Sequence, residues 1–299
     1  MKSFLKKLNK YKYPYLFLAP TIILLFVFSI IPILLALGIS FTDMNLKGLA
    51  DYSNIDFVGI KNYLKLFNDK SFLQALYNTA FYVVVGVPLV IVFSLGIAIL
   101  LNYGTNFLFR FARMLYYAPA ITNIVAVAVI WGYLYNNSYG LLNQVLGFFG
   151  VPSIPWLLNS KWAKLSLIIL AVWKAIGMNM LIFLAALKGI PKSYYEAAEI
   201  DGANGWQKLI SITIPLLSFS VFFVTITTLI GWIQFFEEPM VMTKGGPLNS
   251  TLSLALLIYQ NGFKNSNFGY AAAGSFVLFA IIMIATAVQF KTKKKTVEY

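Results

Sequence analysis

Long apolar runs dominate this sequence and restrict its fold more than any other feature. Six runs, each of about twenty or more residues and so long enough to cross a bilayer as a helix, alternate with polar segments. They cover residues 15–40, 77–101, 115–135, 164–187, 212–236 and 269–290. With 60% hydrophobic residues, the chain is too apolar for a soluble globule. The sequence therefore predicts an all-α, polytopic integral membrane protein with six transmembrane helices.

The residue types that are missing exclude several kinds of chemistry. The 299 residues include no cysteine and no histidine, so disulfides, thiolate metal sites and histidine-based catalysis are excluded. The sequence has no Gly-x-x-x-x-Gly-Lys-Ser/Thr phosphate-binding motif, and no acid, base and nucleophile converge inside the apolar runs. We therefore expect that the chain is not an enzyme and that it binds no cofactor or metal itself.

The polar segment between the fourth and fifth apolar runs, residues 190–217, has the pattern of two short helices joined by a glycine turn. Ser193 and Glu196 have the spacing of a capping box, which predicts a helix that begins at Tyr194. Gly202 is expected to end this helix, because a residue without Cβ adopts the left-handed conformation at little cost. The product should be a helix, a sharp turn and a second short helix.

The second half of this segment carries a further capping pattern, Asn204 with Gln207, and then Ile-Pro-Leu at 214–216. The spacing of Glu-Ala-Ala, three residues, Gly and nine residues to Ile-x-x-Pro resembles the EAA loop of permease subunits of ABC importers. The resemblance implies that the loop is cytoplasmic and that its helix docks on the ATPase subunit. The residues that it assigns to this coupling are Glu196, Ala197, Ala198, Asp201, Gly202 and Ala203. A generic linker between two spans would also need caps and a glycine, but it would not need this full pattern.

Other segments extend the resemblance over nearly the whole chain and narrow it to carbohydrate uptake. They are residues 14–20, 57–63, 243–247 and 269–273. The chain is similar to the first of two paired permeases of the maltose, lactose and glycerol-3-phosphate type. The resemblance implies a type I ABC importer permease fold and three kinds of partner: a second permease subunit, two ATPase subunits that hold ATP and Mg, and an extracellular solute-binding protein.

The distribution of basic residues indicates which side of the membrane each segment faces. Of the 23 Lys and Arg residues, fourteen lie on the side of the two termini and the 190–215 loop, and eight are spread over longer loops on the other side. The positive-inside rule therefore places both termini and this loop in the cytoplasm, and this distribution argues against nucleic acid as a partner. We expect basic cytoplasmic tails at 1–13 and 291–299 and a transmembrane permease domain at 14–290, inserted in the cytoplasmic (inner) membrane.

Lys174 is the charged residue that lies well inside an apolar run. Because an ammonium group in the middle of a bilayer is costly, its side chain should face a wet cavity or a partner. Two interpretations stay open. Lys174 hydrogen-bonds substrate hydroxyls or an acidic group, or it pairs structurally with Glu237, Glu238 or a carboxylate of the second subunit.

The fifth apolar run carries Thr228, Trp232 and Phe235 at i, i+4 and i+7, which share one helical face. Such a face suits a sugar, whose C–H faces stack on aromatic rings and whose hydroxyls need polar partners. By resemblance to the maltose permease, the substrate-path candidates are Ala171, Lys174, Ala175, Met178, Thr228, Gly231, Trp232 and Phe235. The polar amides of that protein are largely replaced here, which argues against maltose itself. Alternatively, the aromatic rings pack against lipid or neighbouring helices.

The function expected from the sequence is that of a permease subunit that imports a mono- or oligosaccharide by alternating access. The alternative is an ABC permease for a non-sugar solute such as glycerol-3-phosphate or another polyol phosphate. An ion-coupled secondary transporter should show acidic residues inside its spans, and an ion channel should show a filter or a charged ring. The apolar runs contain neither feature.

Overall fold

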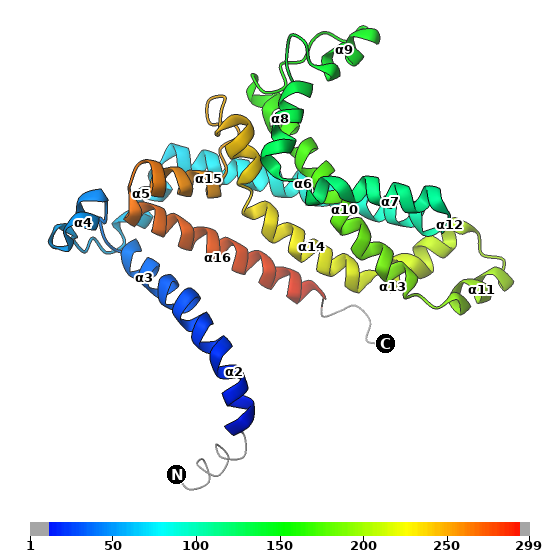
Figure 1. The fold of residues 1–299 in the computed structure, drawn as a ribbon, viewed down its shortest axis with the longest axis horizontal. Helices are drawn as coiled ribbons and strands as arrows, with labels where there is room; N and C mark the ends of the chain where they lie inside the picture. Colours follow the sequence, from blue (N-terminus) through cyan, green and yellow to red (C-terminus); the bar gives the residue numbers. More distant parts are fainter. Residues whose placement is uncertain (1–11, 294–299) are drawn as a thin grey trace. The chain divides into compact units, whose positions relative to one another are not determined.

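The computed structural model describes residues 12–293, and these residues are almost entirely helical (Figure 1). Between the helices, the described part contains two isolated β-bridges, so the predicted all-α class is confirmed. The described chain divides into two compact units: residues 12–66 and 258–276 form unit 1, and residues 67–257 and 277–293 form unit 2. The predicted basic tails lie mostly outside the described residues.

Unit 1 is built around the first apolar run. Its helices are α2 (Lys12–Leu25), η1 (Phe26–Ile30), α3 (Ile31–Ser40), α4 (Leu46–Ala50), η2 (Tyr52–Asn54), most of α5 (Lys61–Asn68), η5 (Gln260–Lys264) and the first turns of α16 (Phe268–Lys293). The first three form one continuous helix, and none of its most apolar window is buried. The π-helical turn η1 ends two residues before Pro32, whose missing N–H disturbs the regular hydrogen-bond ladder. The exposed apolar side chains fit a helix that is solvated by lipid.

The 57–63 segment, one of the segments that carry the family resemblance, holds the end of α3 in place. The Asn62 side-chain amide donates hydrogen bonds to the carbonyl oxygens of Ser40 and Thr42, at 2.9 and 2.8 Å. Gly269 lies close to the same backbone segment. A Cβ atom on Gly269 would be 2.1 Å from the Thr42 carbonyl oxygen. These motif residues therefore build unit 1.

Unit 2 contains the candidate sites. Its helices are α6 (Lys70–Asn102), α7 (Phe107–Ile121), α8 (Ile124–Leu134), α9 (Leu141–Phe148), α10 (Ser160–Lys188), α11 (Lys192–Ile200), α12 (Gly205–Lys208), η3 (Leu209–Thr213), α13 (Ile214–Leu216), α14 (Ser218–Ile233), η4 (Pro239–Thr243), most of α15 (Leu254–Tyr259) and the rest of α16. Helix α10 packs against α6 and α7, and α14 packs against α6 and α10 (Figure 1). Buried apolar side chains from these helices form the core of the unit.

The third apolar run is not one straight span, contrary to the prediction. Helix α7 ends at Ile121 and α8 begins at Ile124, and the two are bent by 103°. Asn123 causes the break, because its side chain accepts a hydrogen bond from the backbone N–H of Val125 at 2.8 Å and thereby caps the start of α8. Hydropathy does not register this break, because the residues on both sides of it are apolar.

The fifth apolar run is broken as well. The helical segment Gly205–Leu216 and helix α14 are bent by 64° at Leu217, whose side chain is fully buried. The described residues thus contain four continuous helices that are long and apolar enough to cross a membrane, or six if each bent pair is one span.

Gly177 allows α10 and α7 to approach closely. A Cβ atom at this position would lie 2.1 Å from the carbonyl oxygen of Tyr116 and 2.8 Å from Cα of Tyr117. Small residues commonly permit such backbone contact between helices in a membrane. The contacted atoms belong to the backbone, so they cannot rotate away as a side chain would.

We therefore expect Gly177→Val to destabilise unit 2 by about 1–3 kcal/mol, because the added side chain must push two helix backbones apart. Thermal melting of the purified protein in detergent measures this effect. Gly96→Val is the matched control, since an added Cβ on that face of α6 meets no atom within 4 Å. Equal melting temperatures of the two variants would contradict the packing role of Gly177.

Candidate functional site

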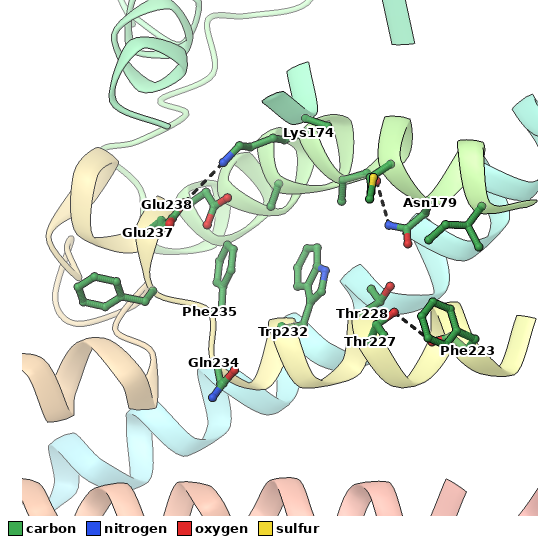
Figure 2. Close-up of a pocket in the computed structure, with 17 residues that line it drawn as sticks. Lys174, Asn179, Phe223, Thr227, Thr228, Trp232, Gln234, Phe235, Glu237 and Glu238 are labelled. Carbon is green, nitrogen blue, oxygen red and sulfur yellow. Dashed lines mark hydrogen bonds and ion pairs between the residues drawn. The ribbon is translucent and has the colours of Figure 1, made fainter. Parts of the chain in front are cut away.

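A cavity of about 820 Å³ lies between α10 and α14 in unit 2 (Figure 2). All eight predicted substrate-path residues line it, namely Ala171, Lys174, Ala175, Met178, Thr228, Gly231, Trp232 and Phe235. The fold therefore brings together residues from two apolar runs that are separated by the whole 190–215 loop. Their part in transport stays a prediction.

One wall of the cavity is a face of α10. The four predicted residues of this helix recur at helical spacing, and Asn179 and Ile182 extend the same face. The Asn179 side-chain amide donates a hydrogen bond to the Ala175 carbonyl oxygen at 2.9 Å. We did not predict Asn179 from the sequence, although its position four residues after Ala175 is the signal that identifies it.

The opposite wall comes from α14 and the segment after it. Helix α14 ends at Ile233, three residues earlier than the predicted end of the fifth span, so Phe235 lies beyond the helix. The prediction that Phe235 shares a helical face with Trp232 is therefore wrong, because the chain turns at Gln234, the C-cap residue. The turn nevertheless stacks the two rings, with centroids 5.1 Å apart and planes 8° apart (Figure 2).

The two rings also belong to the core. Only 6% of Trp232 is exposed, and a Cβ atom at Gly86 of α6 would lie 2.0 Å from its ring. Phe235 makes an edge-to-face contact with the buried Tyr82, at 4.8 Å between centroids. Packing against neighbouring helices, the alternative considered for these aromatic residues, thus accounts for most of their surface. A narrow part of the stack is left to line the cavity.

Lys174 faces a pair of carboxylates at one end of the cavity. Its Nζ lies 3.5 Å from Oε2 of Glu237, as Figure 2 shows. Glu237 is well exposed, and a pair of this kind contributes about 1 kcal/mol or less. Neighbouring Glu238 is buried, and burial raises the pKa of its carboxyl group. The geometry matches the structural-pairing interpretation of Lys174 and also leaves the ammonium group in the cavity wall.

The predicted coupling loop contains the expected two helices, with one correction at its start. Helix α11 begins at Lys192, two residues before Tyr194, and no side chain caps it. The capping box predicted from Ser193 is therefore wrong. Pro191 takes the N-cap position instead, with φ −59°, and its ring already has the φ that a helix start requires.

Gly202 ends α11 as predicted. Its φ of +77° is left-handed, and its N–H donates to the Glu199 carbonyl oxygen at 3.1 Å. The N–H of Ala203 donates to the Ala198 carbonyl oxygen at 2.8 Å. These two bonds form a Schellman motif, the usual glycine-dependent end of a helix.

Helix α12 begins with the predicted capping box. The Asn204 side chain accepts from the Gln207 N–H at 2.9 Å, and the Gln207 side chain accepts from the Asn204 N–H at 2.7 Å. Lys208 at the end of α12 donates to Glu199 of α11 at 2.8 Å, which ties the two helices together. The angle of the loop is therefore set by hydrogen bonds within it.

The predicted coupling residues lie on or near the open surface of this loop. Those that are exposed are Glu196, Ala197, Asp201 and Gly202, and those that are half-buried are Ala198 and Ala203. Two large apolar side chains beside them, Ile200 and Trp206, are 87% and 68% exposed. Exposed apolar side chains on an otherwise polar loop are typical of a surface that contacts another protein. We did not predict a contact for Ile200 from the sequence.

Comparison with known proteins agrees with this architecture. The family described as "Binding-protein-dependent transport system inner membrane component" matches residues 57–295. The lactose transport system permease protein LacF of Rhizobium radiobacter is 37% identical over 283 residues, which cover 92% of each chain. The sn-glycerol-3-phosphate transport system permease protein UgpA of Agrobacterium fabrum is 34% identical over 290 residues, which cover 96% of each chain.

A solved structure shares the fold. It is the crystal structure of a bacterial ABC transporter involved in the import of the acidic polysaccharide alginate, in which the matching chain has a TM-score of 0.79 and 22% sequence identity. The match covers 98% of this chain and 100% of that chain.

Proposed function

Because this chain belongs to the family of inner membrane components of binding-protein-dependent transport systems, we propose that it lines the translocation path of an ATP-driven sugar importer. A second permease subunit completes the path, and an extracellular binding protein delivers a mono- or oligosaccharide to it. Two ATPase subunits supply the energy, and the permease pair alternates between outward-open and inward-open states.

The cavity between α10 and α14 is the observation that carries the sugar assignment. Its wall combines the Trp232–Phe235 stack with the Lys174–Glu237 pair and the hydroxyl-bearing Thr228. A sugar presents C–H faces that pack on aromatic rings and hydroxyls that both donate and accept hydrogen bonds. A volume of about 820 Å³ lies in the range of small-molecule sites, roughly 300–1,000 Å³.

The charges in the cavity favour a neutral sugar over the alternative, a polyol phosphate. The 34% identity to a glycerol-3-phosphate permease keeps the alternative open. A phosphate group is bound by a surplus of positive charge. Among the residues that line this cavity, Lys174 is the one basic side chain, and Glu237 and Glu238 lie beside it. The cavity wall therefore has no surplus of positive charge.

The loop that carries α11 and α12 is the proposed contact with the ATPase. Its exposed Glu196, Ile200 and Trp206 offer one charged and two apolar side chains to a partner. The excess of basic residues beside this loop and at the termini supports a cytoplasmic position for all three. In this arrangement, ATP and Mg bind to the partner ATPase subunits and not to this chain.

Uptake by the complete transporter in proteoliposomes tests the proposal. We expect a neutral sugar, supplied with its binding protein, to enter only when ATP is present. Lys174→Gln should lower the initial rate by about tenfold, because it removes one charge-assisted hydrogen bond. Lys264→Gln is the control, since this exposed lysine belongs to unit 1 and does not line the cavity.

Three results of this experiment would contradict parts of the proposal. Uptake of glycerol-3-phosphate without uptake of any sugar would favour the polyol phosphate alternative. Uptake in the absence of ATP would contradict the importer assignment. An unchanged rate in Lys174→Gln would remove this residue from the substrate path.

A further inference from the structure

A second cavity in unit 2, of about 390 Å³, lies where the first turns of α10 meet α6. The loop that precedes α15 closes it with Leu248 and Ser250. The cavity shares no residue with the sugar cavity between α10 and α14. We refer to it as the lysine cavity, because Lys161 and Lys164 both line it.

The two lysines lie one helical turn apart on the same side of α10. Neither takes part in an ion pair within the part of the chain that the structure describes, residues 12–293. The Nζ atom of Lys164 lies over two rings of α6, at 4.8 Å from the centroid of Tyr77 and 5.6 Å from that of Phe81. These contacts fix the direction of the ammonium group but leave its charge without a counter-ion.

The positive charge of this site comes from side chains and not from the helix end. The side chain of Asn159, the N-cap residue of α10, already accepts from the backbone N–H groups of Lys161 and Trp162, at 2.9 and 3.5 Å. The first turn of the helix is therefore capped by the chain itself. Two ammonium groups remain as donors for a ligand.

A buried hydroxyl in the cavity wall adds a third polar group. Only 5% of Ser250 is exposed, and its Oγ has no hydrogen-bond partner among the described residues. Leaving a buried hydroxyl unpaired costs free energy, so native structures rarely keep one without a reason. A ligand oxygen in the cavity offers Ser250 a partner.

Apolar side chains surround these polar groups. Leu248 is 93% exposed and Tyr77 is also well exposed, and both line the cavity. The cavity thus combines exposed apolar side chains with two lysines that have no ion-pair partner among the described residues. This combination suits a molecule that is both anionic and apolar. A small inorganic anion would use the lysines and leave the apolar rim in water.

We propose that the lysine cavity binds the phosphate group of an anionic amphiphile. Lys161 and Lys164 donate hydrogen bonds to the phosphate oxygens, and Ser250 donates a further one. Leu248 and Tyr77 pack against the carbon part of the ligand. A volume of about 390 Å³ holds a phospholipid headgroup but not its acyl chains, which lie outside the cavity along the apolar surface. A phospholipid and free phosphate share the recognised group, and the two are separated by experiment.

Native mass spectrometry of the delipidated, complete transporter in detergent tests this site. The probes are a short-chain phosphatidylglycerol, phosphatidylcholine of the same chain length, and inorganic phosphate. We expect the first phosphatidylglycerol to bind at least about tenfold more tightly to the wild type than to a Lys161→Gln/Lys164→Gln double variant, because two charge-assisted hydrogen bonds are lost. Phosphatidylcholine should show a smaller difference, because its headgroup carries its own cation.

Matched variants separate the site from general electrostatics and from misfolding. Lys188→Gln removes a lysine from the opposite end of α10 and should bind like the wild type. Lys164→Arg keeps both the charge and the contact with Tyr77 and Phe81, and should also bind like the wild type. The single variant Lys161→Gln keeps the contact of Lys164 with Tyr77 and Phe81. It should lose part of the phosphatidylglycerol affinity that the double variant loses, with an unchanged melting temperature.

Two results would overturn the whole proposal, and a third would overturn its lipid part. Equal binding of phosphatidylglycerol to the wild type and the double variant would show that the lysines form no phosphate site. If Lys188→Gln weakens phosphatidylglycerol binding as much as the double variant does, the total charge of the helix, and not the cavity, attracts the lipid. If inorganic phosphate binds as tightly as the lipid with the same dependence on the lysines, the phosphate site stands and the lipid assignment is wrong. Sugar uptake need not be measured, so this test is independent of the proposed function.

Discussion

Replacing Gly202 with proline is expected to lower ATP-dependent uptake at least about tenfold while the protein remains inserted in the membrane. Gly202 has φ +77°, whereas the ring of proline holds φ near −65°. Proline also lacks the N–H that donates to the Glu199 carbonyl oxygen. The substitution therefore removes the Schellman motif and changes the angle between α11 and α12. Because the loop lies on the surface, the helices of the bundle should keep their packing.

Parallel assays of uptake and ATP hydrolysis in proteoliposomes measure this effect. We expect hydrolysis that no longer depends on the binding protein and its sugar, together with little uptake. Gly205→Ala is the matched control in the same loop, since an added Cβ at Gly205 meets no atom within 4 Å and its φ is not left-handed. Normal uptake by Gly202→Pro would argue strongly against coupling through this loop.

Replacing Trp232 with alanine is expected to lower both sugar uptake and thermal stability. The ring is almost fully buried between Gly86 and Phe235, so its removal should cost about 3–5 kcal/mol through lost burial and the cavity that remains. The same truncation removes the aromatic surface that we propose for sugar stacking, so uptake should fall at least about tenfold. Melting temperature and initial uptake rate are the two measurements.

Trp232→Phe separates packing from substrate contact. Phenylalanine keeps a ring that can stack on Phe235, so this variant should recover most of the stability that alanine loses. If its melting temperature recovers while its uptake stays low, the indole contacts the sugar. If uptake and melting temperature change together in both variants, Trp232 serves the core alone, and the aromatic part of the proposed sugar site is wrong.

Local features of the structure could be read from the sequence with good accuracy. The Asn204 and Gln207 capping box is present, because both partners lie within one helical turn and need no distant contact. Gly202 ends α11, because a left-handed residue is a local requirement of the backbone. The failure at Ser193 is also local: Pro191 begins the helix before the serine can cap it.

Breaks inside apolar runs were not predicted, because hydropathy measures how apolar a segment is and not whether its helix is continuous. Thr122 and Asn123 are two polar residues in an apolar context, and the capping bond of Asn123 divides the third run into two helices that are bent by 103°. The end of α14 at Ile233 was missed for the same reason, since the turn occurs at Gln234, a single polar residue between the apolar Ile233 and Phe235.

The sequence by itself determined the all-α membrane class and the family, because apolar length, capping and motif spacing are properties of neighbouring residues. The resemblance to the family supplied the eight substrate-path candidates, and their part in transport stays a prediction. Only the tertiary structure decided that Lys174 faces Glu237 and that the indole of Trp232 covers Gly86. It also decided that Lys164 lies over Tyr77 and Phe81, and that Lys161 and Ser250 line the same cavity as Lys164. These contacts join residues that are far apart in the chain. In a membrane protein, apolar positions that face lipid and apolar positions that face another helix have the same composition, so the packing of the helices must settle which side chains meet.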